Sequence, residues 1–282
     1  MMKKKYDKIG ELYRLRAFPK TSYGGNKAGV FINGYDLTET DMQTIAKRVN
    51  YSETAFVLKS DLADFKVRFF TPNSEVDLCG HATIATFNLL RDLKIISPGI
   101  YTQETKAGIL KLDVRNDFVF MEQPAPKFYD FVDKNLIRKC FKKIDFDERF
   151  EPQIVSTGIK EIFIAVKSVE ELNALAPDFG AISTLARTYS AIGIHAFSLG
   201  EDADAYGRNF APVVGIDEES ATGTSNGALA CYLYEYWQKK NNYVLRQGYS
   251  MNQPSEIIVN LETENETVVK VHVGGSAIII NQ

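Results

Sequence analysis

The sequence has little of what marks several common classes of protein. Its 282 residues contain three cysteines and three histidines, which are widely spaced and include no Cys-x-x-Cys pair. A disulfide framework or a zinc site is therefore not expected, and no cluster of metal ligands shows in the sequence. No run approaches the roughly 18 apolar residues of a membrane span. The basic N-terminus is not followed by the apolar core of a signal peptide. We therefore expect a reduced, cytoplasmic protein that does not contact a membrane.

Neither sign of charge is in large excess. The chain has 33 basic and 36 acidic residues, a net charge of −3, so no electrostatic footprint points to nucleic acid as a partner. Hydrophobic residues at 45% and charged residues at 24% are ordinary for a globular protein. The length suits one large or two medium domains. A homodimer fits the general frequency of dimers among soluble enzymes, although no segment indicates an interface.

One stretch, from Phe65 to Leu90, joins an apolar strand to a helix of small residues through Cys79, Gly80 and His81. A glycine at a helix start allows close backbone approach, and the first-turn N–H groups have no partners within the helix. Such a terminus attracts anions. The cysteine and the histidine add a nucleophile or acid and a titratable base. The alternative is an ordinary strand–turn–helix crossover with a buried cysteine.

A second copy of this stretch favours the functional interpretation. Residues 208–212 repeat the Arg-x-Phe-x-Pro pattern of residues 68–72. Aligning Gly80 with Gly223, an offset of 143 residues (223 − 80), places Thr222 opposite the cysteine. This offset is far longer than the period of a solenoid. It predicts two similar domains, each with an anion-attracting helix start.

Two loop positions are further candidates. Glu53 lies where a loop enters the apolar strand 55–58. If its side chain faces inward, desolvation raises its pKa and makes it a usable proton carrier. The alternative is that it points to solvent or caps a helix. Gly25 and Asn26 lie in a loop that can take positive φ and bring backbone close to a ligand, although a plain turn is the simpler interpretation.

Periodicity and turn residues predict a mixture of helices and strands. The expected helices are 38–49, 80–90, 136–146, 169–176 and 179–189, and the main strands are 12–18, 28–32, 55–58, 65–70, 108–114, 118–121, 154–158, 161–166, 192–199, 257–261, 268–273 and 277–280. The proline-punctuated segment 123–126 marks a domain boundary. We expect one domain of residues 1–122, completed by the last strand at 275–282, and another of residues 123–274. His195 is expected to be a core or edge residue with satisfied hydrogen bonds, and the acidic run 217–220 is expected to be a solvated approach to a helix.

Taken in order, these motifs resemble the phenazine-biosynthesis PhzF-like family, within the diaminopimelate-epimerase fold superfamily. The resemblance covers nearly the whole chain and rests on Ala17-Phe18, Gly25-Asn26, Ser52-Glu53-Thr54-Ala55-Phe56, Phe70-Thr71-Pro72, Asp77-Leu78-Cys79-Gly80-His81-Ala82-Thr83, Phe210-Ala211-Pro212, Ala221-Thr222-Gly223-Thr224, Gln247-Gly248 and Gly274-Gly275.

The resemblance implies an α+β fold of two similar domains, each a curved mixed β-sheet wrapped around a central helix. It also implies an isomerase without cofactor or metal, acting on a small carboxylic acid between the domains. By resemblance to trans-2,3-dihydro-3-hydroxyanthranilate isomerase, Glu53 would shuttle a proton, assisted by His81 and Glu219. The expected substrate-binding residues are Gly25, Asn26, Cys79, Gly80, Thr222, Gly223, Thr224 and Ser225; backbone N–H groups and the last two hydroxyls would hold the substrate carboxylate.

The sequence departs from the family pattern at one catalytic position and from the epimerases of the wider superfamily at a second position. Glu219 stands where the family has aspartate, and Thr222 stands where the superfamily's epimerases have a second cysteine. A threonine hydroxyl is too weak an acid to replace a thiol, so two-thiol epimerisation is not expected. Two alternatives remain open: an amino- or hydroxy-acid racemase that uses Glu53 and Cys79, and a non-catalytic protein that binds a small anion or a partner.

Overall fold

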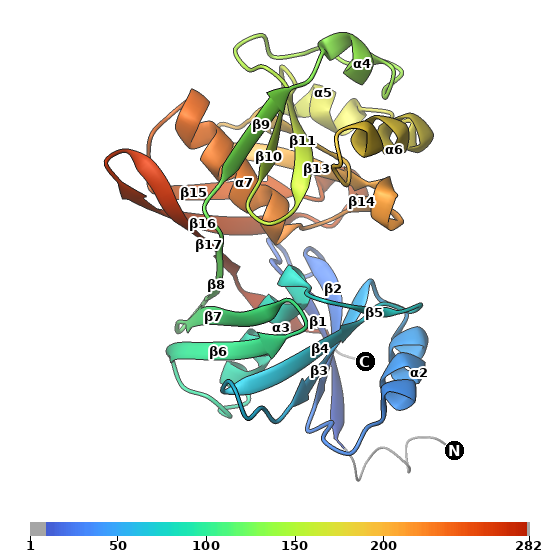
Figure 1. Ribbon diagram of the computed structural model, residues 1–282, viewed down its shortest axis with the longest axis vertical. Coiled ribbons are helices and arrows are strands. Elements are labelled where there is room, and N and C mark those ends of the chain that lie inside the picture. Colours follow the sequence, from blue (N-terminus) through green and yellow to red (C-terminus); the bar gives the residue numbers. More distant parts are fainter. Residues whose placement is uncertain (1–9, 281–282) are drawn as a thin grey trace. The chain divides into compact units, whose positions relative to one another are not determined.

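The computed structural model describes residues 10–280, which form two compact units (Figure 1). The first unit runs to Glu122 and includes the chain from Gly274 onward, and the second is Gln123–Val273. The elements of the first unit are β1 (Glu11–Ala17), β2 (Asn26–Ile32), α2 (Glu39–Val49), β3 (Glu53–Leu58), β4 (Phe65–Phe70), β5 (Glu75–Val76), α3 (Gly80–Asp92), β6 (Gly99–Thr105), β7 (Gly108–Val114), β8 (Val119–Gln123) and β18 (Ala277–Ile279).

The second unit contains the remaining described elements. They are β9 (Lys127–Phe131), α4 (Lys134–Arg138), β10 (Gln153–Ser156), β11 (Lys160–Ala165), α5 (Val169–Ala174), α6 (Phe179–Thr188), β12 (Ile194–Leu199), β13 (Ala205–Ala211), η1 (Pro212–Val214), β14 (Ile216–Glu219), α7 (Gly223–Tyr236), β15 (Asn242–Gln247), η2 (Tyr249–Met251), β16 (Ser255–Glu264) and most of β17 (Thr267–Gly275). The helices expected near 38–49, 169–176 and 179–189 are therefore present.

The two units share one order of strand pairing. In the first, β1–β2 is antiparallel, β2–β3 parallel, β3–β4 antiparallel, β4–β6 parallel and β6–β7 antiparallel, and β5 pairs with β4. In the second, the same sequence of directions runs through β10, β11, β12, β13, β15 and β16, and β14 pairs with β13. The predicted internal repeat is thus a repeat of topology.

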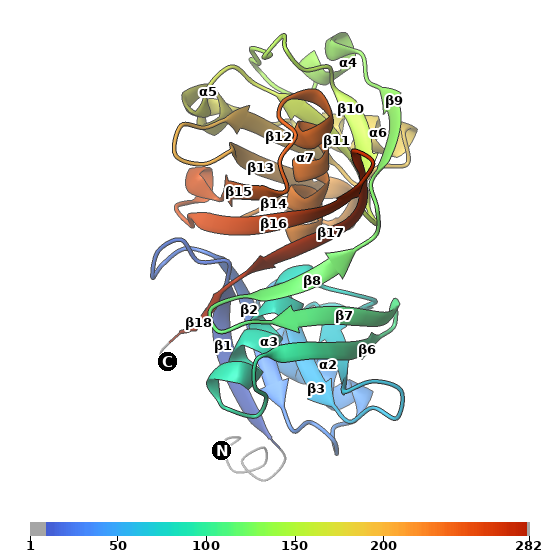
Figure 2. The same ribbon diagram turned by 90° about the vertical axis from the view of Figure 1, so that its left-hand side faces the viewer.

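Each unit is built around one buried helix. Every residue from His81 to Leu90 of α3 is buried, and so are eleven of the residues of α7. A helix that is buried on all sides lacks a polar face, which agrees with the run of small and apolar residues in both segments. Figures 1 and 2 show each helix lying inside the curved mixed sheet of its own unit. The predicted α+β fold, with a central helix in each of two similar domains, is confirmed.

The repeated Arg-x-Phe pattern makes the same contacts in both units. Arg68 binds Glu75 through Nε and Nη2 at 2.7 and 2.8 Å, which ties β4 to β5. Arg208 binds Glu218 in the same bidentate way at 2.8 and 2.9 Å, which ties β13 to β14. Each guanidinium also lies over the phenylalanine two residues later, at 5.2 and 4.9 Å from the ring centre. The arginine therefore fixes the chain just ahead of each central helix.

The helix expected at 136–146 is wrong over most of its length. Helix α4 begins after Asp133, whose carboxylate accepts from the Asn135 N–H, and ends at Arg138. The apolar residues beyond it are buried, as their spacing suggested, but Phe141 and Phe146 reach the core by forming isolated β-bridges. Tertiary packing has overridden a helical period, because the same spacing of apolar residues can also be buried from an irregular chain.

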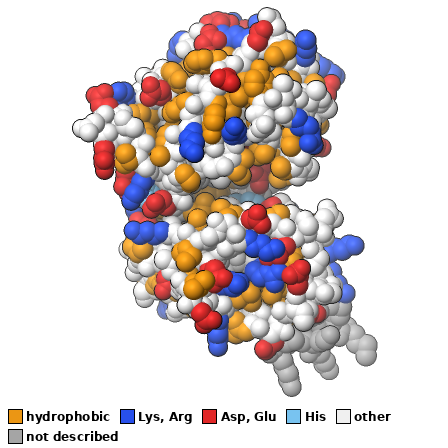
Figure 3. Space-filling model, viewed as in Figure 1, with side chains coloured by type: hydrophobic (Ala, Val, Ile, Leu, Met, Phe, Trp, Pro, Cys, Tyr) orange, Lys and Arg blue, Asp and Glu red, His pale blue; other side chains and the backbone are white. Residues whose placement is uncertain are grey.

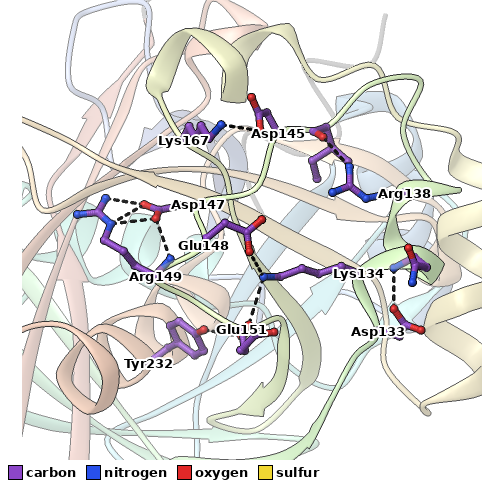
Figure 4. A network of polar contacts seen from close by, with 12 residues as sticks. Asp133, Lys134, Arg138, Asp145, Asp147, Glu148, Arg149, Glu151, Lys167 and Tyr232 are labelled. Atoms are coloured by element: carbon purple, nitrogen blue, oxygen red, sulfur yellow. Dashed lines mark hydrogen bonds and ion pairs between the residues drawn. The ribbon is translucent and has the colours of Figure 1, made fainter.

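Ion pairs hold the segment that follows α4 (Figure 4). Lys134 binds Glu148 at 2.6 Å and Glu151 at 3.2 Å. The backbone oxygen of Glu151 accepts a hydrogen bond from the Tyr232 hydroxyl of α7 at 2.6 Å. The segment is thus tied to the central helix of its unit at this point.

Two smaller expectations also needed correction. The acidic run 217–220 belongs largely to β14 rather than to a solvated helix approach. His195 is fully buried, and its Nδ1 lies 3.2 Å from Asn209 Nδ2, but its Nε2 has no hydrogen-bond partner within residues 10–280. Burial lowers the pKa of His195 to about 3, so the ring is neutral. Only its expected core position is confirmed.

The surface agrees with the balanced composition. The face drawn in Figure 3 carries acidic and basic side chains interspersed with apolar ones. Within residues 10–280, no helix has both the length and the apolar character needed to cross a membrane. All three cysteines are buried and none forms a disulfide.

Candidate active site

Three titratable side chains meet at the N-terminus of α3. Glu53 is the first residue of β3, Cys79 is the N-cap of α3, and His81 is the second residue of that helix. His81 Nε2 lies 3.3 Å from Glu53 Oε2, and His81 Nδ1 lies 3.4 Å from Cys79 Sγ. We call these residues the Glu53–Cys79–His81 cluster. The spacing of cysteines and histidines along the chain did not indicate it, because the carboxylate comes from a separate strand.

The Glu53 carboxyl of the cluster is buried and has a raised pKa. Its side chain is 11% exposed, and its Oε2 makes no hydrogen bond within residues 10–280. Burial raises the pKa of Glu53, although hydrogen bonds from Ser52 and Cys79 partly oppose this effect. The side chain therefore faces inward, as its predicted role requires. A carboxyl group whose charged form is destabilised can accept and return a proton closer to neutral pH than an exposed one.

Polar groups from the start of β2 and from the turn before β3 surround the imidazole. Asn26 Nδ2 lies 3.3 Å from His81 Nδ1, and Ser52 Oγ lies 3.4 Å from His81 Nε2. Gly25 has φ of +85°, and a Cβ on it would lie 2.6 Å from the backbone oxygen of Ala17. Only glycine fits this position without strain. The predicted Gly25–Asn26 pair thus has a structural reason, which is to set the asparagine beside the histidine.

The start of α3 carries no side-chain cap. Cys79 makes no capping hydrogen bond, and the first turn contains no acidic residue. The first N–H groups of a helix need a partner from outside the helix, and the helix dipole favours an anion. A Cβ on Gly80 would meet only Met121 Cε, at an ordinary 3.6 Å, so packing within this unit does not demand glycine there. This terminus can receive a carboxylate.

The second unit presents a related arrangement at the start of α7. Thr222 is the N-cap and makes no capping hydrogen bond, and its hydroxyl instead donates to Glu219 Oε2 at 2.5 Å. Gln247 on β15 fixes both residues. Its Nε2 donates to the Glu219 backbone oxygen at 2.6 Å, and its Oε1 accepts from the Thr222 N–H at 3.2 Å. The structure thus brings the two predicted site residues Glu219 and Thr222 into contact.

The other predicted residues of this unit behave differently. Gly223 is the buried first residue of α7, and the backbone oxygen of Thr224 accepts from the Thr157 hydroxyl at 3.2 Å. Ser225 is 1% exposed, and its hydroxyl contacts Asn209 Nδ2 at 2.9 Å and the Glu161 carboxyl. That hydroxyl is hydrogen-bonded inside the unit, so we do not propose it as a substrate ligand.

Sequence reasoning missed two residues that support the site. Ser52 and Gln247 both lie in motifs that carried the family resemblance, but neither was given a role. Ser52 hydrogen-bonds the Glu53 carboxyl, and Gln247 holds the Glu219 backbone. The one available signal was their place beside a predicted site residue or turn. Spacing alone cannot show which of two neighbouring polar residues points inward.

Residues 161–168 resemble residues 53–60 in sequence, but the two segments do not occupy equivalent strands. Ala28 of β2 pairs with Glu53 of β3, whereas Glu161 lies on β11, the counterpart of β2 rather than of β3. Burial raises the pKa of Glu161, but Asn209 and Ser225 hydrogen-bond to its carboxyl. Glu161 is therefore a buried, fully engaged carboxyl and a useful control for Glu53.

Comparisons with known proteins found similar sequences along nearly the whole chain. A model of the family described as phenazine biosynthesis-like protein matches residues 15–282. An uncharacterized isomerase of Clostridium acetobutylicum is 35% identical over 288 residues, covering 95% of each chain. The trans-2,3-dihydro-3-hydroxyanthranilate isomerase of Pseudomonas chlororaphis is 30% identical over 277 residues, covering 93% of this chain and 94% of that protein.

A solved structure shows the same fold. The crystal structure of the Bacillus anthracis phenazine biosynthesis protein of the PhzF family superposes with a TM-score of 0.89 and 30% sequence identity, covering 97% of both chains. The similar proteins that carry an activity in their names are isomerases, which supports an isomerase as the class of this enzyme.

Proposed function

Because the chain belongs to the family of phenazine biosynthesis-like proteins, we propose that it is an isomerase that moves a proton on a small carboxylic acid by means of Glu53. One observation carries the proposal. The Glu53 carboxyl is buried, its pKa is raised, and its Oε2 has no hydrogen bond from any residue that the structure describes while lying 3.3 Å from the His81 ring. This is the environment expected of a general acid–base group rather than of a structural carboxylate.

In the proposed reaction, Glu53 as carboxylate removes a proton from a carbon near the substrate carboxylate. It then returns that proton to another carbon of the same molecule, so the reaction needs no external acceptor. His81, 3.3 Å away, orients the carboxyl and shares its proton. The uncapped first turn of α3 stabilises the negative charge that develops on the substrate. Proton transfer by these side chains requires no cofactor.

We assign Glu219 a supporting role. It stands where the family resemblance places an aspartate, and the Thr222 hydroxyl and Gln247 fix its side chain and backbone. A carboxylate held in this way can accept a hydrogen bond from a polar substituent of the substrate. The longer side chain of glutamate shifts the charge by about an ångström, a displacement that matters in a catalytic site. The physiological substrate therefore need not be that of the Pseudomonas relative.

The experiment is solvent-deuterium incorporation measured by mass spectrometry. The protein is incubated in D2O with a panel of small carboxylic acids that includes trans-2,3-dihydro-3-hydroxyanthranilate. The proposal predicts deuterium in one substrate class with the wild type and none above background with Glu53→Gln, which retains substrate binding. Full deuterium uptake by Glu53→Gln would remove Glu53 from the mechanism.

One observation favours a second candidate, an amino- or hydroxy-acid racemase. Cys79 Sγ lies 3.4 Å from His81 Nδ1, and the thiol hydrogen-bonds to the Glu53 carboxyl. A thiol and a carboxyl could serve as the two acid–base groups of a racemase. This candidate predicts deuterium at Cα of an amino or hydroxy acid, with loss of that label in Cys79→Ser. Retention of the label in Cys79→Ser would leave the Glu53 isomerase.

A further inference from the structure

The Glu53–Cys79–His81 cluster contains the three kinds of side chain that bind zinc. Each residue offers one ligand atom, and these atoms all lie within 4.8 Å of one another. Zinc in proteins is bound by cysteine sulfur, histidine nitrogen and carboxylate oxygen, and sites that keep an open fourth position use three protein ligands. No spacing along the chain indicated such a cluster, but the fold assembles one.

The separations agree with a single tetrahedral ion. Zinc–ligand distances of about 2.0–2.3 Å place nitrogen and oxygen roughly 3.4 Å apart, and nitrogen and sulfur roughly 3.6 Å apart. In the structure, His81 Nε2 lies 3.3 Å from Glu53 Oε2 and 3.9 Å from Cys79 Sγ. These two separations lie within a few tenths of an ångström of the tetrahedral values, and the ligand atoms of Glu53 and Cys79 lie within 4.8 Å of each other. Asn26 faces Nδ1, so Nε2 is the nitrogen directed to the ion, and the Ser52 hydroxyl near it would turn aside.

The charges select the kind of cation. The N-terminus of α3 carries a partial positive charge that opposes any cation. A cysteine thiolate and the Glu53 carboxylate together neutralise a divalent ion, and binding releases the thiol proton to solvent. Hard cations such as magnesium prefer oxygen ligands and would find only one carboxylate here. Among the described residues 10–280, none forms a hydrogen bond with the buried Glu53 Oε2.

We propose that Glu53, Cys79 and His81 form a binding site for one zinc-like divalent ion, and that occupancy inhibits the enzyme. A bound ion takes the lone pairs that Glu53 and His81 need for proton transfer. The inhibition, but not the binding, rests on the proposed function. The site makes this enzyme sensitive to borderline-soft metal ions and leaves it insensitive to magnesium.

Binding is tested with Co²⁺ as a visible probe on the full-length protein under reducing, chelator-free conditions. The wild type should bind one equivalent, with the visible absorption of tetrahedral cobalt and a near-ultraviolet thiolate-to-cobalt band, and Zn²⁺ should abolish both. Cys79→Ser should lose the thiolate band, and His81→Gln should weaken binding at least about tenfold. Cys140→Ser is the matched control, because Cys140 is also a buried thiol but lies outside the cluster. Circular dichroism verifies the fold of each variant.

Inhibition is tested in the deuterium assay, with Zn²⁺ or Mg²⁺ added to metal-free enzyme. The proposal predicts loss of exchange at one equivalent of zinc and no effect of magnesium. The site is overturned if a folded Cys79→Ser variant keeps the thiolate-to-cobalt band. It is also overturned if the wild type shows no cobalt band. Zinc that accelerates exchange overturns the inhibitory role. If no substrate exchanges, the proposed function fails while the cobalt titration still decides the site. If a substrate exchanges but the wild type shows no cobalt band, the proposed function stands and the metal site is overturned.

Discussion

Replacing Arg208 by methionine tests whether one buried charge anchors β14 and, with it, Glu219. The Arg208 side chain is 7% exposed and forms the bidentate pair with Glu218, whose side chain is 15% exposed. Its Nη1 also donates to the backbone oxygens of Leu172 and Leu175 at 3.1 and 2.8 Å. Methionine keeps the apolar contact area but leaves the Glu218 carboxylate without its ion-pair partner, with a hydrogen bond from the Ser250 hydroxyl at 2.7 Å.

The expected loss follows from the burial of the pair. Removing one partner of a buried ion pair costs about 3–5 kcal/mol, because the other charge stays uncompensated. Arg68→Met in the first unit is the matched comparison. Arg68 is 19% exposed, and its partner Glu75 keeps a second ion pair with Lys106 at 2.5 Å. We therefore expect a loss of only about 1–2 kcal/mol for Arg68→Met.

Urea unfolding measures both losses. Trp237, the one tryptophan of the chain, lies in the second unit, so its fluorescence reports on Arg208→Met. Far-ultraviolet circular dichroism follows Arg68→Met. Adding Glu218→Gln to Arg208→Met should recover part of the loss, since it removes the stranded charge. A loss under about 1 kcal/mol for Arg208→Met, or a double variant less stable than the single one, would refute the reasoning.

Three further predictions concern the site. Because the pKa of Glu53 is raised in the folded protein, its protonation stabilises the wild type at a pH below 4.5, the ordinary pKa of glutamate. This contribution to the free energy of unfolding is lost as the pH rises through the raised pKa. Glu53→Gln should therefore gain stability relative to the wild type over this pH range, by about 1.4 kcal/mol for each tenfold difference in the acidity of Glu53 between the folded and unfolded states. Urea unfolding midpoints at several pH values measure the gain. A stability difference between the two proteins that does not change with pH would contradict this prediction. Gly25→Ala should lower the melting temperature more than Gly215→Ala, because both glycines have positive φ (+85° and +80°) but only a Cβ on Gly25 meets other atoms; equal losses would argue against the contact. Glu219→Gln should slow deuterium exchange about a hundredfold in a folded protein, and an unchanged rate would exclude Glu219 from the site.

The fold was predictable from the sequence because the two units repeat the same local pattern. The Arg-x-Phe-x-Pro motifs at 68–72 and 208–212 mark equivalent strands, and both are followed by a helix rich in small and apolar residues that is buried along most of its length. The partners of the two arginines were not predictable by the same means. Glu75 follows its arginine by seven residues and Glu218 by ten, so no single spacing identifies them.

The candidate site could be predicted only in part, for a physical reason. Glu53, Cys79 and His81 were each chosen from local context, but their contact depends on the parallel pairing of β2 with β3 and on the packing of α3. Such long-range contacts leave no periodic trace in the sequence. The direction of the Ser225 hydroxyl was not predictable either. One turn of a helix contains positions that face into the unit and positions that face out of it, and the sequence does not show which of these Ser225 occupies.

The central claim is that Glu53 carries the proton, and one comparison tests it most directly. Deuterium exchange is measured for the wild type, Glu53→Gln and Glu161→Gln with the same substrate, and substrate binding is verified for each. Glu161 is also a buried glutamate with a raised pKa near the start of a strand, but Asn209 and Ser225 already engage its carboxyl. The account predicts that exchange disappears in Glu53→Gln and stays within about tenfold of the wild type in Glu161→Gln. Exchange that survives in Glu53→Gln, or falls equally in both variants, would contradict it.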